Sequence, residues 1–254
     1  MKTAVITGGA GGLGRALDRV LRREGWHTVL IDLPGAALDG LEALPERTVL
    51  GCDLTDGAAL ERACAAIRAA RPSVDLVIYN AGVTQIGAFG EAPEEAHRRL
   101  FEINYFAAVA MARALLADVR AAKGTHLAVS SVAGFAPLRH RTGYAASKHA
   151  LEGFFKSLRA EERAHGVACL IAAPSFVATN IGNAEARQGG LSRPGAAADG
   201  IDYMAPEEAA EIILRGLKRG RAFIPVGRVA RLSYLVNRLS PGLFEWLMRR
   251  KISG

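Results

Sequence analysis

Short runs of apolar residues alternate with longer helical patterns through most of the chain. The apolar runs predict strands over 3–7, 27–32, 47–53, 74–82, 125–131, 167–174 and 222–227. Apolar residues at helical spacing predict helices over 14–25, 56–70, 93–122 and 143–166. Strands that are almost wholly apolar and are separated by helices are typical of a parallel sheet covered on both faces. We therefore predict an α/β fold with a doubly wound parallel sheet.

Two regions depart from this alternation. Residues 182–200 are rich in Gly, Ala and polar residues, which indicates a long loop of the kind that often serves function. Beyond the strand at 222–227 the chain changes to two basic helical segments on either side of Ser240-Pro241-Gly242. We divide the chain into a Rossmann domain over 1–227 and a basic amphipathic helical extension of that domain over 228–254.

Composition and charge exclude several classes of protein. The net charge is +7, and from Arg219 onward eight basic residues stand against the single acid Glu245, so this end of the chain accounts for the whole excess. The high pI therefore does not indicate a nucleic-acid-binding fold. Strand-like sequence begins at Lys2 and leaves no room for a signal peptide. We expect a cytoplasmic protein that has reduced cysteines at Cys52, Cys64 and Cys169 and no metal site.

Five glycines occur in the eight-residue stretch TGGAGGLG, between the first predicted strand and the first predicted helix. An open parallel sheet binds dinucleotides at this point. The helix N-terminus offers free N–H groups and a positive dipole end to a pyrophosphate, and glycine lets the backbone approach it. The stretch fits G-x-G-x-x-G as Gly9, Gly11 and Gly14, and T-G-x-x-x-G-x-G as Thr7, Gly8, Gly12 and Gly14.

Asp32 ends the second predicted strand, at the distance from Gly14 that is expected of an acid that binds a ribose 2′-hydroxyl. A carboxylate accepts a hydrogen bond from that hydroxyl and repels a 2′-phosphate. Arg15 is the one nearby basic candidate for a phosphate, and the helical turn after Gly14 is not the obvious place for such a contact. The sequence therefore favours NAD over NADP.

Tyr144 and Lys148 lie four residues apart in a predicted helix, so they share one face. A nearby ammonium favours the phenolate and is expected to lower the pKa of Tyr144, which suits acid/base work near neutral pH. Ser131 lies upstream, at the carboxyl end of a predicted strand, where open α/β sheets place their ligands. These three residues form a candidate catalytic group.

These motifs together resemble the short-chain dehydrogenase/reductase family over residues 2–227. The matching stretches are TGGAGGLG, Asp53 in CDLT, Asn80-Ala81-Gly82, Asn104 in FEINYF, Ser131 in VSSVAG, and Tyr144-x-x-x-Lys148. The resemblance implies that Tyr144 is the catalytic acid/base and that Lys148 lowers its pKa and holds the nicotinamide ribose. It also implies that Ser131 orients the substrate oxygen and that Asn104 holds a water in a proton relay.

The resemblance assigns further residues to the cofactor. Asp53 is implied to contact the adenine edge, Asn80, Ala81 and Gly82 to line the adenosine ribose, and Thr179 to reach the nicotinamide carboxamide. The rest of the implied cofactor set is Leu13, Leu54, Pro174 and Val177. Pro174-Ser175 departs from the usual Pro-Gly of the family, which bears on the local backbone and on the placement of the nicotinamide.

The substrate is expected to be a small secondary alcohol or its ketone. Phe135 and Leu138, between Ser131 and Tyr144, are candidate walls of its site, as are Gln85 and Ile86, while residues 182–204 resemble the variable substrate lid of the family. The alternative is a non-catalytic NAD-binding regulatory protein of the same fold. An epimerase or dehydratase relative usually carries a larger C-terminal domain than this chain can build. The family also implies a homo-oligomer.

The C-terminal segment has two stripes of apolar residues at helical spacing, which arginines interrupt. They are Val229, Leu232, Leu235, Val236 and Leu239, then Leu243, Phe244, Leu247 and Met248. Such a pattern indicates either a helical pair packed on the domain or on a neighbouring subunit, or a peripheral membrane contact through 228–252. We favour packing, because it is the commoner role of an apolar stripe.

Overall fold

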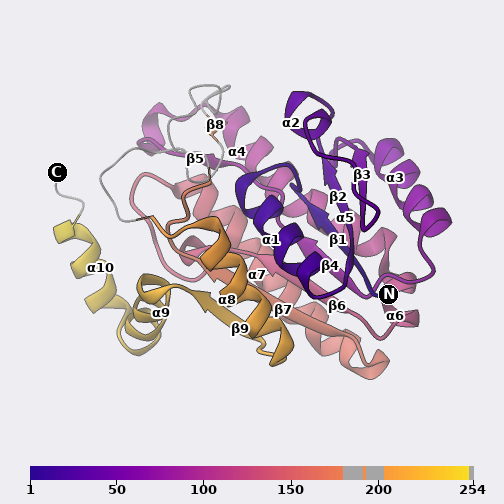
Figure 1. Cartoon of the computed structure of the whole chain (residues 1–254). Helices are drawn as coiled ribbons and strands as arrows, with labels where there is room; N and C mark the ends of the chain where they lie inside the picture. Colours follow the sequence, from indigo (N-terminus) through magenta and orange to yellow (C-terminus); the bar gives the residue numbers. More distant parts are fainter. Residues whose placement is uncertain (180–190, 193–202, 252–254) are drawn as a thin grey trace.

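Seven parallel strands form the central sheet of the protein (Figure 1). The computed structural model describes residues 1–179, 191–192 and 203–251. The strand order is β3-β2-β1-β4-β6-β7-β9, which confirms the doubly wound α/β fold. The strands are β1 (Thr3–Thr7), β2 (His27–Asp32), β3 (Arg47–Gly51), β4 (Leu76–Tyr79), β6 (Thr125–Val129), β7 (Ala168–Pro174) and β9 (Phe223–Val226). A separate antiparallel pair joins β5 (Thr84–Gln85) to β8 (Leu191–Ser192).

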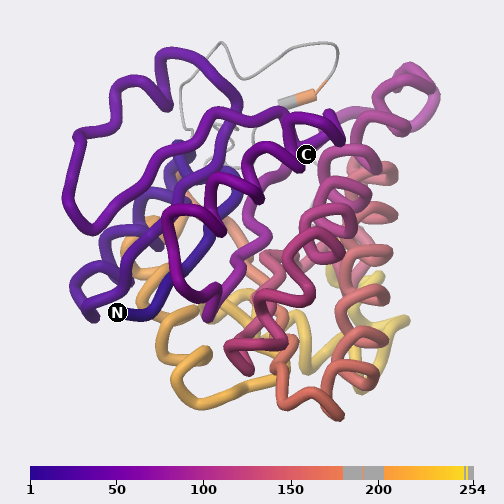
Figure 2. The backbone as a smooth tube through the Cα atoms, turned by 90° about the vertical axis from the view of Figure 1, so that its right-hand side faces the viewer, coloured from indigo at the N-terminus to yellow at the C-terminus, as the bar shows by residue number. Residues whose placement is uncertain are grey.

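Helices cover both faces of this sheet (Figures 1 and 2). The helices are α1 (Gly12–Arg23), α2 (Ala36–Asp39), α3 (Gly57–Ala70), α4 (Glu94–Phe101), α5 (Ala107–Ala114), α6 (Leu116–Ala121), α7 (Thr142–Glu162), α8 (Pro206–Lys218), α9 (Arg228–Leu239) and α10 (Pro241–Lys251). Helices α1 and α8 pack together in one hydrophobic core, while α3, α5 and α7 contribute to the core on the other face. Most side chains of the strands are apolar because successive side chains point to opposite cores. On β1, Ala4 and Ile6 enter the first core and Val5 enters the second.

The long helix predicted over 93–122 is interrupted twice. A π-helical turn over Glu102–Phe106 separates α4 from α5, and Leu115, with a ψ of 8°, separates α5 from α6. Periodicity alone does not reveal a π turn, because the turn inserts a residue without ending the helix. This turn carries Asn104, which is buried.

A polar pair lies inside the second core. The Tyr79 hydroxyl and the His126 Nδ1 are 2.7 Å apart, and the ring of Tyr79 lies 4.7 Å from that of Phe155. His126 is fully buried, and its Nε2 has no hydrogen-bond partner among the described residues. Burial lowers the pKa of His126 to about 4, with Glu162 opposing the change. The core therefore holds this imidazole in its neutral form.

The C-terminal helices pack on the domain through one side. Ala230 of α9 and Phe244 of α10 are buried against Val132 and Ala136, which follow β6. The packing interpretation of this segment is confirmed for that side. The opposite side exposes seven large apolar side chains, namely Val229, Leu232, Leu235, Leu239, Leu243, Trp246 and Leu247. None of the described helices is long and apolar enough to cross a membrane.

The packing of α10 generates a prediction with an internal control. Phe244 is 4% exposed and the adjacent Leu243 is 48% exposed. We expect Phe244→Ala to lower the free energy of unfolding by about 3 kcal/mol, because it leaves a cavity against Val132 and Ala136. Leu243→Ala should cost less than about 1 kcal/mol. Urea unfolding of both variants measures the difference, and equal effects would contradict the packing described here.

The buried imidazole predicts a pH dependence of stability. The unfolded chain binds a proton at His126 near pH 6.5, whereas the folded chain binds it only near pH 4. Stability is therefore complete above pH 6.5 and is lost as the pH falls through this window. Between pH 7.5 and pH 5 the loss should be about 2 kcal/mol. Urea unfolding at the two pH values should show this loss in the natural protein and a correspondingly smaller loss in His126→Gln. A His126→Gln variant with an unchanged pH dependence would refute the assignment.

Candidate active site

The glycine loop, residues Thr7–Gly14, lies in contact with three other segments of the chain. A Cβ at Gly9 would lie 2.7 Å from the Leu30 Cβ, and one at Gly12 would lie 2.8 Å from the Thr179 oxygen. A Cβ at Gly14 would overlap the carbonyl oxygen of Gly8, and Gly8 has a φ of +66°. Side chains at these positions would drive the loop away from β2 and from the segment after β7. The glycines therefore serve the packing of the loop as well as any ligand.

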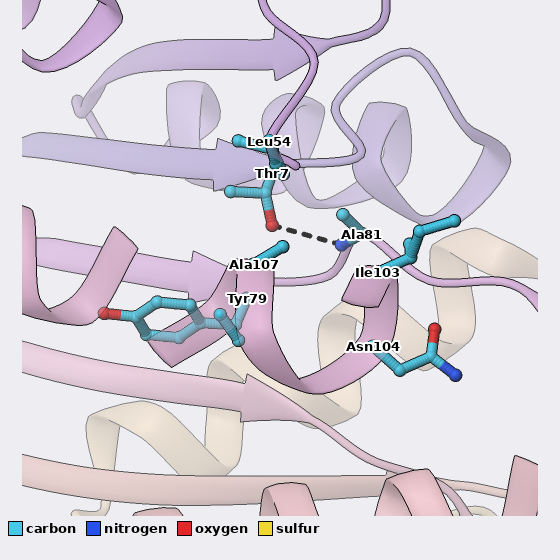
Figure 3. Close-up of a pocket in the computed structure, with 8 residues that line it drawn as sticks. Thr7, Leu54, Tyr79, Ala81, Ile103, Asn104 and Ala107 are labelled. Carbon is cyan, nitrogen blue, oxygen red and sulfur yellow. Dashed lines mark hydrogen bonds between the residues drawn. The ribbon is translucent and has the colours of Figure 1, made fainter. Parts of the chain in front are cut away.

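Hydrogen bonds tie the loop to the end of β4. The Thr7 hydroxyl accepts from the backbone N–H of Asn80 at 3.0 Å and of Ala81 at 3.1 Å. The Asn80 amide donates to the carbonyl oxygens of Thr7 at 3.1 Å and of Gly8 at 3.0 Å. Figure 3 shows Thr7 and Ala81 at the edge of a small pocket that Leu54 and Asn104 also line. Its volume of about 10 Å³ is enough for one water molecule at most.

The start of α1 and Asp32 together form a site that fits a dinucleotide. Gly11, the N-cap of α1, provides no side-chain cap, so the first N–H groups of this helix are left for an anion. The Asp32 carboxylate accepts from the backbone N–H of Ala10 at 2.8 Å and of Leu33 at 2.9 Å. These bonds hold the carboxylate beside the glycine loop, and its remaining lone pairs can accept from ribose hydroxyls.

Arg15 lies closer to this site than we expected. Its guanidinium donates to the carbonyl oxygens of Ala10 and of Ala37, both at 2.8 Å. It therefore bridges the glycine loop and α2, which follows the strand that ends at Asp32. The long side chain folds back over the glycine loop, so Arg15 stays the nearby basic candidate for a 2′-phosphate.

Tyr144, Ser131 and Lys148 come together next to the carboxyl end of β6. Tyr144 and Lys148 are buried on one face of α7, with the Lys148 Nζ 5.9 Å from the centre of the Tyr144 ring. The Ser131 hydroxyl lies near the Tyr144 phenol, where it favours the phenolate. The Lys148 Nζ donates to the carbonyl oxygen of Val129 at 2.9 Å.

Burial dominates the electrostatics of this group. It raises the pKa of Tyr144, and the nearby Ser131 hydroxyl and the charge of Arg141 offset this only in part. It also lowers the pKa of Lys148 to about 8, against the attraction of Glu152. Desolvation of the phenolate thus outweighs the contributions that lower the pKa of Tyr144. The expected effect of Lys148 on this pKa stays a prediction.

The Asn104 side chain is held by hydrogen bonds to Val83 and Ser147. Its Oδ1 accepts from the Val83 N–H at 2.8 Å, and its Nδ2 donates to the Val83 oxygen and to the Ser147 hydroxyl, each at 2.9 Å. A Cβ at Gly82 would lie 3.1 Å from the Asn104 Oδ1 and 3.5 Å from the Lys148 Nζ, so the two side chains flank this glycine. Ser147 was missed by the sequence analysis, although its place directly before Lys148 was a signal.

The remaining residues of the implied cofactor set lie around the same edge. Leu13 is buried in α1, Leu54 borders the small pocket, and Thr179 contacts Gly12. The Asp53 carboxylate accepts from the N–H and the hydroxyl of Thr55, at 2.9 and 2.7 Å, which lowers its pKa. Pro174 ends β7, and Val177 is buried. Ser175 has no positive φ, so this backbone does not require the glycine that is usual in the family.

The candidate substrate residues separate into two groups. Leu138 packs in a cluster with Tyr144 and Leu191, next to the phenol. Gln85 pairs with Leu191 across β5 and β8, and its buried Oε1 has no partner among the described residues. The predicted lid over 182–204 lies outside the described residues, apart from 191–192 and 203–204.

Phe135 packs against the C-terminal helices. Its ring centre lies 5.7 Å from that of Phe223 and 5.3 Å from that of Tyr234, so it packs under α9. Its carbonyl oxygen accepts from the Asn237 amide at 2.7 Å. The turn after Ser131 directs this side chain toward the C-terminal helices, which the local sequence does not reveal, and its role as a substrate wall stays a prediction.

In the described part of the chain, the other side chains that could carry chemistry form no second site. Within the described ranges, no group of His, Cys, Asp and Glu side chains could hold a metal ion. The three cysteines are free and buried. Burial raises the pKa of the Cys64 thiol to about 11 and that of Cys169 to about 12, so neither forms a thiolate near neutral pH.

Comparisons with known proteins agree with this geometry. Residues 2–189 match the short chain dehydrogenase family. The chain is 33% identical over 267 residues to Dehydrogenase/reductase SDR family member 7B of Bos taurus, and the match covers 96% of this chain and 79% of that protein.

Solved structures share the fold. A short chain dehydrogenase from Burkholderia cenocepacia in complex with NADP has a TM-score of 0.84 at 22% identity, over 98% of this chain and 99% of that one. A short chain dehydrogenase/reductase from Burkholderia phymatum in complex with NAD has a TM-score of 0.78 at 23% identity, over 94% of both chains. Proteins of this fold thus include one solved with each cofactor.

Proposed function

The chain belongs to the short-chain dehydrogenase family, and from this premise we propose that it transfers a hydride reversibly between NAD(H) and a secondary alcohol or its ketone. The observation that carries the proposal is the buried Tyr144 phenol, with the half-buried Ser131 near it and the Lys148 ammonium on the same face of α7. Two adjacent hydroxyls can both address one substrate oxygen, and the cation stabilises charge that develops there. The glycine loop and Asp32 support a nicotinamide dinucleotide as the cofactor.

Each residue has a separate part in this proposal. The nicotinamide, when bound, supplies or accepts the hydride. Tyr144 donates its proton to the carbonyl oxygen during reduction, and the raised pKa keeps that proton available at neutral pH. Ser131 holds the same oxygen through its hydroxyl. Lys148 binds the nicotinamide ribose and stabilises the phenolate that remains, and Asn104 holds a water of the proton relay.

Asp32 supports NAD as the preferred cofactor. Its carboxylate is fixed by two backbone N–H groups, so it cannot easily turn away from a 2′-phosphate. Arg15 is the counter-argument, because its guanidinium lies over the same loop. Its guanidinium donates hydrogen bonds to two backbone carbonyl oxygens, which hold it in a supporting position, and we therefore retain the proposal of NAD.

The alternative is a non-catalytic NAD-binding regulatory protein of the same fold. The buried Lys148 favours catalysis, because a binding module has no need of a desolvated ammonium next to a phenol. A homo-oligomer and a cytoplasmic location stay predictions. So does a peripheral membrane contact of the outward side of α9 and α10, whose signature would be salt-sensitive binding to anionic vesicles.

The assignment of the acid/base is tested by Tyr144→Phe. We expect kcat with a panel of ketones and NADH to fall by about 10²- to 10⁴-fold, because the proton donor is lost. The affinity for NADH, measured by fluorescence, should stay nearly unchanged. Tyr105→Phe is the control, since it removes a phenol outside the pair with Ser131. Lys148→Ala should weaken cofactor binding as well as turnover. Undiminished turnover in Tyr144→Phe would reject the assignment.

The cofactor preference is tested at Asp32. Asp32→Ala combined with Leu33→Arg should change the preference for NADH over NADPH by about tenfold or more, which is at least about 1.4 kcal/mol. The reason is that the double variant removes a repulsion and adds a partner for the 2′-phosphate. Arg15→Met should leave NADH binding nearly unchanged. Tighter binding of NADPH than of NADH by the natural protein would show that Arg15, and not Asp32, decides the preference.

A further inference from the structure

A buried carboxylate lies on the same face of α7 as the catalytic group. Tyr144, Lys148, Glu152 and Lys156 follow one another at four-residue spacing, so each stands one turn from the next. Glu152 is 1% exposed and Lys148 is 4% exposed. The sequence analysis did not identify Glu152, although its spacing from Tyr144 and Lys148 was a signal.

Two neighbours hold the Glu152 carboxylate in place. The Ser130 hydroxyl donates to Oε1 at 2.8 Å, and the Lys156 ammonium donates to Oε2 at 2.7 Å. Ser130 is the residue directly before Ser131, so Glu152 contacts the segment that carries the second catalytic hydroxyl. A buried carboxylate is costly unless such partners satisfy it. Ser130 and Lys156 satisfy both oxygens of Glu152, so the charge is held at this position.

The chain leaves space for this contact. A Cβ at Gly134 would overlap both the Ser130 Oγ and the Glu152 Oε1. Gly134 has no positive φ, so its backbone does not by itself require glycine. The absence of a side chain at this position allows the carboxylate to reach the turn after β6.

We propose that Glu152 is a positioning residue for the hydride transfer, whose buried carboxylate supplies the counter-charge that keeps Lys148 cationic beside Tyr144. This inference rests on the proposed function. The two residues stand one helical turn apart, at which Cβ atoms are about 5–6 Å from each other. In a buried setting an opposite charge one helical turn away favours the protonated form of an ammonium, and Glu152 acts on Lys148 in this direction.

Among the described residues, few other charged groups surround Lys148. On α7 the titratable or charged groups around this site are Tyr144, Glu152 and Lys156, with Arg141 acting on Tyr144. From β6 and the turn after it come the carbonyl oxygen of Val129 and the hydroxyls of Ser130 and Ser131, and the π turn brings the amide of Asn104. Burial lowers the pKa of Lys148 to about 8, and the attraction of Glu152 is what opposes this. Without Glu152, Lys148 would lose its proton closer to neutral pH.

The experiment compares two variants that are expected to shift the pH profile in opposite directions. Glu152→Gln keeps an acceptor for Ser130 but removes the charge. We expect the alkaline limb of the pH profile, for kcat/KM and for NADH affinity, to move to lower pH by about one to two units. Lys156→Met, at a half-exposed side chain, leaves the Glu152 charge less neutralised. It should move the same limb to higher pH.

Glu162→Gln is the matched control. Glu162 lies on α7, is also 1% exposed and is paired with Arg120 at 2.8 and 2.6 Å, about 21 Å along the helix from Lys148. The Glu162→Gln variant should be less stable than the natural protein, but the alkaline limb of its pH profile should not move. An unmoved limb in Glu152→Gln, an equal shift in Glu162→Gln, or a shift to lower pH in Lys156→Met would overturn the inference. The pH dependence of NADH binding reports on Lys148 even if the enzyme turns over no ketone. A lack of turnover in the natural protein would count against the proposed function and not against the role of Glu152.

Discussion

The close contact of the glycine loop with its neighbours is the constraint on which the rest of the site depends. The loop lies against Leu30, Ala81 and Thr179, which come from three different segments. Because no Cβ intervenes, the end of β1, the end of β4 and the start of α1 meet at one edge of the sheet. That edge then holds the free N–H groups of α1, the Asp32 carboxylate and the Thr7 hydroxyl within one site.

Helix α7 carries Tyr144 and Lys148 next to this edge of the sheet. It carries a buried polar face through an otherwise apolar core, and each of those polar groups has a defined partner. The Lys148 ammonium donates to the backbone carbonyl oxygen of Val129. The Ser147 hydroxyl donates to the backbone carbonyl oxygen of Tyr144 and accepts from the Asn104 amide. Fully partnered polar groups in a medium of low dielectric constant are held rigidly. Such rigidity is what acid/base chemistry requires, because the reacting hydroxyl must stay within reach of one substrate oxygen.

The C-terminal helices are part of the domain and also shape its surface. Phe135, Phe223 and Tyr234 form an aromatic cluster beneath α9, in which the rings of Phe223 and Tyr234 are stacked at 4.6 Å. This cluster lines a groove of about 460 Å³, with Lys156 and Arg238 among its other residues. The turn after Ser131 therefore contributes side chains to two different regions. Its first residues serve the catalytic group, while Phe135 supports the C-terminal helices.

The sequence by itself determined the order of strands and helices, the glycine loop, Asp32 and the group of Ser131, Tyr144 and Lys148. These follow from local rules, since apolar periodicity, glycine content and four-residue spacing are properties of neighbours in the chain. The tertiary structure decided what depends on distant neighbours. It directed Phe135 toward α9, brought Arg15 back over the glycine loop, and raised the pKa of Tyr144 through burial. It also placed Glu152 behind Lys148, because burial and pairing of a side chain depend on which segments pack against it, and no local pattern specifies those.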